Sequence, residues 1–207
     1  MRATHAALIV LIALLASGQA ARAQTRHSAP DGTFSISLPS DWVPIPTLEL
    51  YFFENPGRKG PVPPEVLAEF RDTRMGFQMP AEKWFTLPYM IVTVEKGRKR
   101  TAKDLFMESV MAEKDSETSA PKEGYRFLEK EHLPTKRVTY YKDVSYSAAQ
   151  GRNVAMGVYT YLTSQGFLRV AWFAAEDDPR ATGNMLHQAA MSVTLSPQME
   201  YRPEGRK

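Results

Sequence analysis

Alternating apolar and polar residues predict a β-strand near the N-terminus. Phe34, Ile36 and Leu38 alternate with two serines, and Pro39 follows them. Successive side chains of a strand point to opposite faces, so this pattern is typical of a strand with one buried face. Because proline cannot donate a ladder hydrogen bond, we expect the strand to end at Pro39. Trp42 follows shortly and is expected to close the edge of the same core.

Further strand signals recur along the chain. They lie at residues 74–79, 84–97, 136–146, 153–163 and 167–175. In the second of these segments, pairing is expected to begin only after Pro88. The last three segments are neighbours joined by short loops that contain Gly151 and Gly166. This arrangement predicts an antiparallel meander of three strands.

The side chains of the last hairpin favour one register. A three-residue loop at 164–166 would pair Leu162 with Leu168, Thr160 with Val170, and Val158 with Trp172. That register makes one face of the hairpin uniformly apolar and puts the loop glycine in the left-handed conformation of a bulged turn. A two-residue turn would instead pair Leu162 with Arg169 and place a charge among aliphatic residues. We therefore expect the first register, with Tyr161 beside Arg169 on the opposite face.

Helix signals separate and follow the strands. Pro64 suits the first turn of a short helix, and Thr101 with Asp104 forms a capping box in front of a longer one. Asp178 is an expected N-cap, because a proline at the first helical position and an apolar stripe follow it. Residues 47–64 are compatible with a helix or with an extended segment.

The first 23 residues have the order of a secretory signal peptide. Arg2 precedes an apolar run that ends at Ala16, and Ala21 and Ala23 form a small-residue cleavage motif. Cleavage after Ala23 would make Gln24 the first residue of the mature chain. The competing interpretation is a retained membrane anchor, which needs about 20 mostly apolar residues, more than this run provides.

These signals divide the chain into four parts. We expect a signal peptide at 1–23, a linker at 24–33, a single α+β domain at 34–195 and a flexible tail at 196–207. The linker is identified by the polar composition of residues 24–33. The tail follows the last apolar helix.

Composition narrows the classes of protein that fit. The chain has no cysteine, so neither a disulfide nor a lipid anchor on cysteine is available, and the core must supply the stability. The formal net charge of +3 falls to +1 if Arg2 and Arg22 leave with the signal peptide. A nearly neutral protein gives no general argument for nucleic acid partners. The basic cluster at 96–100 is expected to be a solvated turn.

Histidines offer the main candidate chemistry. His187 and Met191 lie one turn apart on the last helix, a spacing that a soft metal such as copper could use. Two ligands do not define a site, and His187 is expected to be solvated, so a plain surface is favoured. His132 lies beside Glu129 and Glu131, a combination suited to general acid–base chemistry. Alternating charges are, however, typical of an exposed segment.

Common catalytic motifs do not occur in the chain. We find no G-x-S-x-G elbow, no Walker A loop and no G-x-G-x-x-G. Tyrosines gather on the meander, where they could stack on a sugar, contact a partner or pack beneath helices. The sequence thus indicates no catalytic residue, cofactor or metal. It leaves Tyr159, Tyr161 and Arg169 as a candidate binding face.

Several phrases of the sequence resemble the PsbP-like superfamily. They are F-x-I-x-L-P-x-x-W at 34–42, the buried run PYMIVTV, the segment GFLRVAWFAAEDDP and the terminal MLHQAAMSVTL. The resemblance spans residues 34–195. It implies an α+β fold in which an antiparallel sheet lies between helices, together with binding or accessory roles. It carries no catalytic signature onto this chain.

We therefore expect an exported, non-catalytic binding or accessory protein that is periplasmic or secreted. Its partner would be another protein or component of the cell envelope, with no nucleic acid and no cofactor. Two alternatives stay open. One is an envelope enzyme of the hydrolase type with a spatially assembled site around His132 or His187. The other is a soft-metal carrier that uses His187 and Met191.

Overall fold

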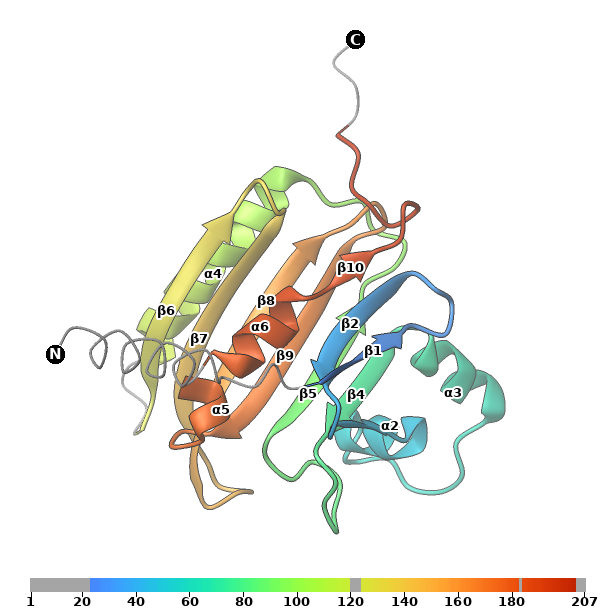
Figure 1. The fold of residues 1–207 in the computed structure, drawn as a ribbon, viewed down its shortest axis with the longest axis vertical. Coiled ribbons are helices and arrows are strands. Elements are labelled where there is room, and N and C mark those ends of the chain that lie inside the picture. The colour runs from blue at the N-terminus through green and yellow to red at the C-terminus, as the bar shows by residue number, and fades with distance from the viewer. Residues whose placement is uncertain (1–22, 120–123, 183, 204–207) are drawn as a thin grey trace, which may run out of the picture.

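A seven-stranded antiparallel sheet forms the centre of the computed structural model, which describes residues 23–119, 124–182 and 184–203 (Figure 1). The strand order is β3-β4-β5-β9-β8-β7-β6. The bounds are β3 (Val43–Ile45), β4 (Arg74–Gln78), β5 (Tyr89–Val94), β6 (Arg126–Leu133), β7 (Val138–Ser147), β8 (Arg152–Leu162) and β9 (Phe167–Ala175). The predicted meander is confirmed as β7, β8 and β9, and β5 does begin directly after Pro88.

A smaller three-stranded sheet packs on one face of the large one. It contains β1 (Gln24–Ser28), β2 (Phe34–Pro39) and β10 (Thr194–Leu195), in the order β1-β2-β10. The predicted strand that ends at Pro39 is β2. Residues 24–28, expected to belong to a linker, instead form β1. Their polar side chains are mostly exposed, while their backbone pairs with β2 from Gln24 opposite Pro39 to Ser28 opposite Ser35. Polarity therefore did not prevent strand formation at this sheet edge.

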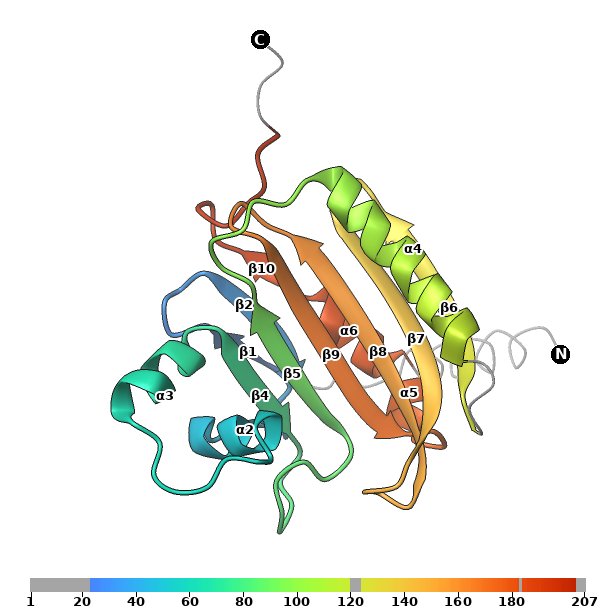
Figure 2. The same ribbon diagram turned by 180° about the vertical axis from the view of Figure 1, so that it is seen from behind.

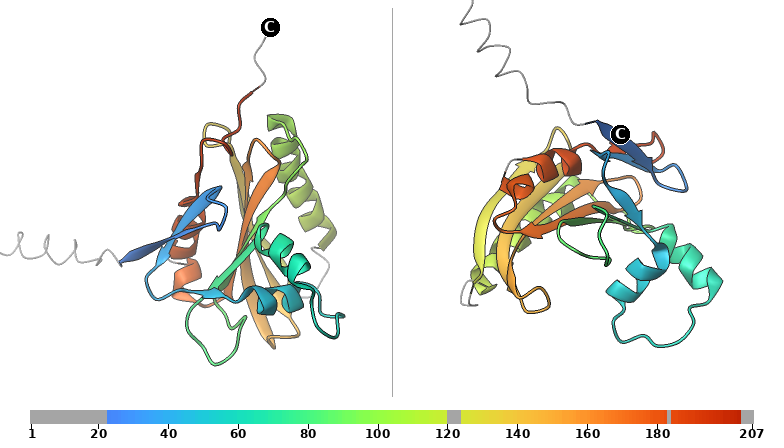
Figure 3. Two further views of the ribbon diagram at one scale, coloured as in Figure 1. Left: turned by 90° about the vertical axis from the view of Figure 1, so that its right-hand side faces the viewer. Right: turned by 60° about the horizontal axis from the view of Figure 1, so that its bottom comes forward.

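Helices cover both faces of the large sheet (Figures 2 and 3). They are α2 (Thr47–Glu54), α3 (Pro64–Arg71), α4 (Ala102–Ser119), α5 (Pro179–Thr182) and α6 (Met185–Met191). The small sheet, α5 and α6 lie on one face, and α2, α3 and α4 lie on the other. The expected α+β fold with an antiparallel sheet between helices is confirmed. The ambiguous segment 47–64 provides α2 and a loop.

The main core lies between the large sheet and the layer of α6 and β2. Ile36, Phe77, Tyr159, Trp172 and Leu186 are almost completely buried there. The opposite face has two smaller apolar clusters, one beneath α2 and one beneath α4. Burial of these apolar side chains supplies the main stabilising contribution to the folded state in a chain without disulfides.

The register of the β8–β9 hairpin differs from the prediction by one residue. Leu162 pairs with Phe167, and Tyr159 pairs with Val170. The loop therefore has four residues, and the Thr163 backbone N–H donates to the Gly166 carbonyl at 2.9 Å. A one-residue shift moves every side chain of one strand relative to its partner. The tyrosine rings, not the aliphatic residues expected, share the main core with Val170.

Gly166 is required for a reason that the sequence did not reveal. Its φ is +148°, and a Cβ at this position would lie 2.8 Å from the carbonyl oxygen of Glu95. The Glu95 backbone N–H in turn donates to the Phe167 carbonyl at 2.8 Å. The segment after β5 therefore passes directly over the hairpin loop, and only glycine leaves room for it.

The part of the predicted flexible tail that the structure describes is packed. Met199 is completely buried, and its carbonyl accepts a 2.9 Å hydrogen bond from the Ser164 N–H. Glu200 forms an isolated β-bridge with Thr163. Residues 196–203 therefore belong to the fold, because an apolar anchor and backbone hydrogen bonds hold them on the β8–β9 loop. Residues 204–207 lie outside the described range.

Two helix starts agree with the sequence signals. The Asp104 N–H donates to the Thr101 hydroxyl at 3.2 Å, and Asp104 Oδ2 accepts from the Thr101 N–H at 2.7 Å, which completes a capping box. The Arg180 N–H donates to Asp178 Oδ1 at 2.8 Å. The single final helix that was expected is, however, two short helices. Asn184, with φ of +61°, lies between them.

Candidate functional site

His187 lies against buried tyrosines, although it was expected to be solvated. Its Nδ1 is 2.9 Å from the Tyr159 hydroxyl, and its ring meets the ring of Tyr140 edge to face at 5.2 Å. The predicted apolar stripe is buried at Leu186, Ala189 and Ala190, and His187 is only partly exposed because its ring reaches the tyrosines of the sheet. Met191 also contacts a tyrosine, since its Sδ accepts from the Tyr161 hydroxyl at 3.8 Å.

Charged residues of β6 and β7 border this tyrosine cluster. The Tyr140 hydroxyl donates to Glu131 Oε2 at 2.8 Å, and Lys142 Nζ forms an ion pair with Glu129 Oε1 at 2.6 Å. The rings of Tyr140 and Tyr159 stack at 5.0 Å. The structure thus connects Glu131 to His187 through two tyrosines, a link between residues far apart in the sequence.

Burial favours the uncharged forms of the tyrosine side chains and of His187 near neutral pH. It raises the pKa of the Tyr140 and Tyr159 hydroxyls, and it lowers the pKa of His187, an effect that nearby Lys142 reinforces. A neutral imidazole can hold the Tyr159 hydroxyl in place. Tyr159 itself is completely buried, so this hydroxyl is not accessible to a substrate. The contacts are those of a cluster that secures α6 to the sheet.

His132 lies on the other face of the sheet, away from the carboxylate of Glu131. Its ring meets Phe106 of α4 edge to face at 5.7 Å, and its Nδ1 is buried without a hydrogen-bond partner. Neighbouring side chains of a strand point to opposite faces. The His132 imidazole and the Glu131 carboxylate, which are adjacent in the sequence, therefore do not form the acid–base group that was predicted. Within 23–119, 124–182 and 184–203, no three His, Asp or Glu side chains form a group that could hold a metal ion.

The predicted binding face does not form. Tyr159 and Tyr161 are buried in the main core, where the Tyr161 hydroxyl donates to the Ala190 carbonyl at 2.8 Å. Arg169 lies on the opposite face, where it forms an ion pair with Glu108 of α4 at 3.0 Å. The incorrect register is the cause, since it had placed Tyr161 and Arg169 on one side. Because the tyrosine hydroxyl groups have hydrogen-bond partners, the rings are buried without the free-energy cost of an unpaired polar group.

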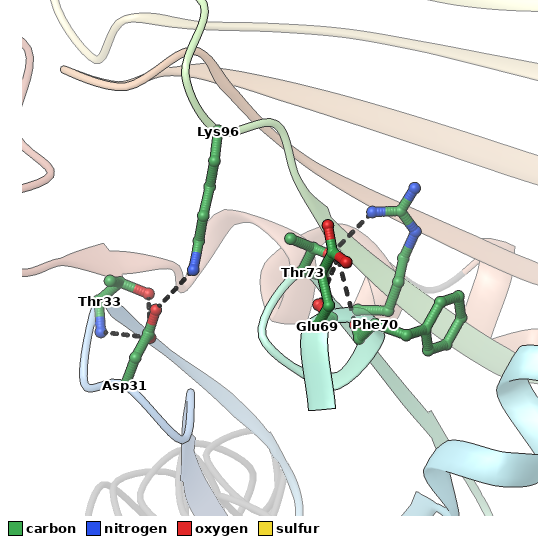
Figure 4. A network of polar contacts seen from close by, with 7 residues as sticks. Asp31, Thr33, Glu69, Phe70, Thr73 and Lys96 are labelled. Atoms are coloured by element: carbon green, nitrogen blue, oxygen red, sulfur yellow. Dashed lines mark hydrogen bonds and ion pairs between the residues drawn. The ribbon is translucent and has the colours of Figure 1, made fainter. Parts of the chain in front are cut away.

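Part of the basic cluster is held by ion pairs. Lys96 Nζ lies 3.0 Å from Asp31 Oδ2 in the β1–β2 turn, and Asp31 also accepts from Thr33 (Figure 4). Arg100 forms an ion pair with Glu95 at 2.7 Å and lies over the ring of Phe167. These two side chains therefore fasten the segment between β5 and α4 to the fold, whereas Arg98 and Lys99 are exposed.

Exposed apolar side chains gather on the face that carries α2, α3 and α4. We define the partner face by six residues of α2, the β4–β5 loop and α4: Leu48, Phe53, Trp84, Phe106, Met107 and Met111. Each has more than a third of its surface exposed. Figure 2 shows this face, with α4 above β6, β7 and β8 and the short helices beside β4. Central strands β5 and β9 run between the two helical regions.

The partner face has features that distinguish it from scattered surface residues. Phe53 stacks on Phe85 at 3.8 Å, and Phe85 meets Tyr89 at 5.6 Å, so the exposed rings continue into a buried aromatic cluster. On α4, Leu105 and Ser109 are buried, whereas Phe106 is 50% exposed and Met107 is 42% exposed. Large exposed apolar side chains that gather on one face mark interaction sites, and here they form two groups on either side of β5 and β9. The sequence contained a signal for this face, because Phe106, Met107 and Met111 exceed what one buried stripe of α4 needs.

Comparisons with known proteins give structural similarity alone. No protein-family model matches the chain, and no curated protein sequence matches it. The Ran-binding protein Mog1p of Saccharomyces cerevisiae is similar over 84% of this chain and 96% of its own, with 11% identity and a TM-score of 0.49. Cyanobacterial PsbP from Synechocystis is similar over 86% of this chain and 96% of its own, with 13% identity and a TM-score of 0.44.

A third similar structure is LpqN of Mycobacterium tuberculosis, described as involved in cell envelope biogenesis. It covers 84% of this chain and 91% of its own, with 11% identity and a TM-score of 0.41. At these identities and TM-scores, no family, site residue or partner is transferred from these structures to this chain.

Proposed function

We propose that this chain is an exported, non-catalytic binding or accessory protein of the cell envelope, and that it docks another envelope protein on its partner face. The observation that carries the proposal is the concentration of exposed apolar side chains on α2, α4 and the β4–β5 loop. Phenylalanine, tryptophan and methionine are enriched at protein interfaces and are costly to leave in water. The face therefore has the chemistry of a docking surface.

Polar groups interrupt the partner face, which favours a protein as its occupant over a lipid surface. Lys103 is exposed on α4, Asp104 lies in its first turn, and the Glu108–Arg169 ion pair borders the apolar side chains. Protein interfaces combine an apolar centre with a polar rim. Among the described residues, no helix is long and apolar enough to cross a membrane.

Crosslinking in living cells tests the partner face. A photoreactive amino acid at Phe106, which is 50% exposed, is expected to give a crosslinked product of discrete mass. Tyr146 provides the matched control, because it is a large exposed side chain at 56% and lies outside the partner face. Mass spectrometry of the products identifies the partner. A product that forms equally at Tyr146, or at neither position, would contradict the proposal.

Substitution provides the quantitative arm of this test. Phe106→Ser with Met111→Ser is expected to weaken binding of the identified partner at least about tenfold, since buried aromatic anchors often contribute 2 kcal/mol or more. The fold should be retained, because both side chains are largely exposed. Undiminished binding would exclude the partner face. Hydrolase turnover that His187→Ala abolishes would favour the enzyme alternative instead.

Export makes a separate prediction. The cleavage site at Ala21 and Ala23 lies at the boundary of the described residues, with 1–22 outside them, and β1 begins at Gln24. Cleavage after Ala23 would therefore leave the small sheet complete. N-terminal sequencing of the mature protein is expected to begin at Gln24. An intact Met1 in the membrane fraction would favour the anchor interpretation.

A further inference from the structure

Two exposed methionines are neighbours on α4. Met107 is 42% exposed and Met111 is 48% exposed, and the two are four residues apart on one helix. Side chains with this spacing lie next to each other on a helix surface. Leu105 and Ser109, the buried positions of α4, are each two residues before one of them and project about 200° away from it. Both methionines are therefore open to a small molecule in solution.

The other methionines among the described residues are less accessible. Met90 and Met199 are completely buried. Five more are half-buried: Met75, Met79, Met156, Met185 and Met191. The chain has no cysteine, so no thiol competes with the thioethers for an oxidant. Among the described residues, Met107 and Met111 are thus the sulfur-containing side chains that are easiest to reach.

A thioether reacts with a peroxide without help from a second residue. The sulfur attacks one peroxide oxygen, so that an S–O bond forms while the O–O bond breaks. A proton moves to the departing oxygen, which leaves as water. Sulfur is oxidised by two electrons and the peroxide is reduced by two. Methionine sulfoxide reductases reverse the step with a dithiol, which becomes a disulfide while the sulfoxide oxygen leaves as water.

We propose that Met107 and Met111 form a reversible oxidation site, and that their sulfoxides weaken docking on the partner face. The effect on docking rests on the proposed function, whereas the oxidation itself needs no partner. Methionine adapts to an interface through a flexible apolar side chain. A sulfoxide is polar, and burying it against a partner without a hydrogen bond costs free energy. Peroxide would therefore act on docking while the core stays intact.

Peptide mass spectrometry tests the oxidation site on the mature protein. Limited hydrogen peroxide is expected to add one oxygen atom to each of Met107 and Met111 while Met90 and Met199 stay reduced, because oxidation follows exposure. The circular dichroism spectrum should not change. Sulfoxide reductases for both epimers, with dithiothreitol, should restore the original mass. Oxidation of Met90 and Met199 at the same rate, or none at Met107 and Met111, would overturn the proposal whether or not a partner docks.

Crosslinking tests the effect on docking. In cells that carry a photoreactive amino acid at Phe106, brief peroxide treatment is expected to lower the yield of crosslinked product at least about fivefold, since a buried polar group without a partner is costly. Each yield is compared with that of the same variant without peroxide. Met107→Leu with Met111→Leu should remove the sensitivity, because leucine has no thioether. Met75→Leu, half-buried against the main core, is the matched control and should remain sensitive.

A polar substitution separates the sulfoxide from other effects of peroxide. Met107→Gln with Met111→Gln is expected to lower the crosslink yield at Phe106 without an oxidant. An equal loss with peroxide in the double leucine variant, or an undiminished yield when both methionines are oxidised, would overturn the proposal. A Phe106 position that gives no product in untreated cells would instead refute the proposed docking, while the mass spectra still decide the oxidation site.

Discussion

Replacing Gly157 with alanine is expected to destabilise the protein by about 3 kcal/mol, near the upper end for an overpacked core. A Cβ at Gly157 would lie 2.4–2.6 Å from three atoms of the Trp172 indole. Trp172 is almost completely buried in the main core and pairs with Gly157 in the β8–β9 ladder. The indole therefore cannot move aside without disturbing its neighbours. Chemical denaturation measures the loss, which corresponds to a melting temperature lower by roughly 10 °C.

Gly57→Ala is the matched control for this substitution. A Cβ at Gly57 would meet no atom within 4 Å, and its φ is not in the left-handed region. We expect a change within about 0.5 kcal/mol. Trp172→Leu in the Gly157→Ala background should show strong non-additivity, since the clash disappears with the indole. A Gly157→Ala protein as stable as the control would show that the indole does not pack on this glycine.

Asp143→Asn is expected to stabilise the protein by about 2 kcal/mol at pH 7.5. Asp143 lies on β7, is only 6% exposed, and its Oδ1 has no hydrogen-bond partner. Burial raises the pKa of this carboxyl to about 6 from its ordinary value of 3.8. Ionisation in the folded state therefore costs free energy, and an amide of the same shape removes that cost.

The sign of the pH dependence follows from proton binding. Between about pH 4 and pH 6 the folded state holds a proton on Asp143 that the unfolded state has released, so stability falls as the pH rises through this window. The advantage of Asp143→Asn should disappear near pH 4. Asp177→Asn is the control, because Asp177 is exposed and pairs with Arg152 at the surface. Urea titrations at pH 7.5 and near pH 4 measure the free energy of unfolding of both variants. A gain in stability that does not depend on pH would contradict the interpretation.

Local signals in the sequence found most elements of the fold. The alternation around Ile36, the capping box at Thr101 and the N-cap Asp178 depend on residues within a few positions of one another. Their outcome is set by backbone geometry that neighbours determine. The α+β class and the meander followed from the order of such signals.

Signals that depended on distant partners were misjudged. The polar strand β1 forms because its backbone pairs with β2 at the edge of the small sheet. Met199 is held in place because it packs beside the β8–β9 loop. The candidate face of Tyr159, Tyr161 and Arg169 failed because aliphatic residues were assumed to form the buried side. Tyrosine can replace them when its hydroxyl has a partner, as Tyr161 has in the Ala190 carbonyl.

The sequence by itself determined the antiparallel α+β architecture, the absence of disulfides and the expectation of export. Only the tertiary structure decided the register of β8 with β9, the contact of His187 with Tyr159, the separation of His132 from Glu131, and the gathering of exposed apolar groups on α2 and α4. The physical reason is the distance along the chain over which each effect acts. Backbone propensity and side-chain alternation act between near neighbours, whereas burial, cavities and docking surfaces depend on which distant segments pack together.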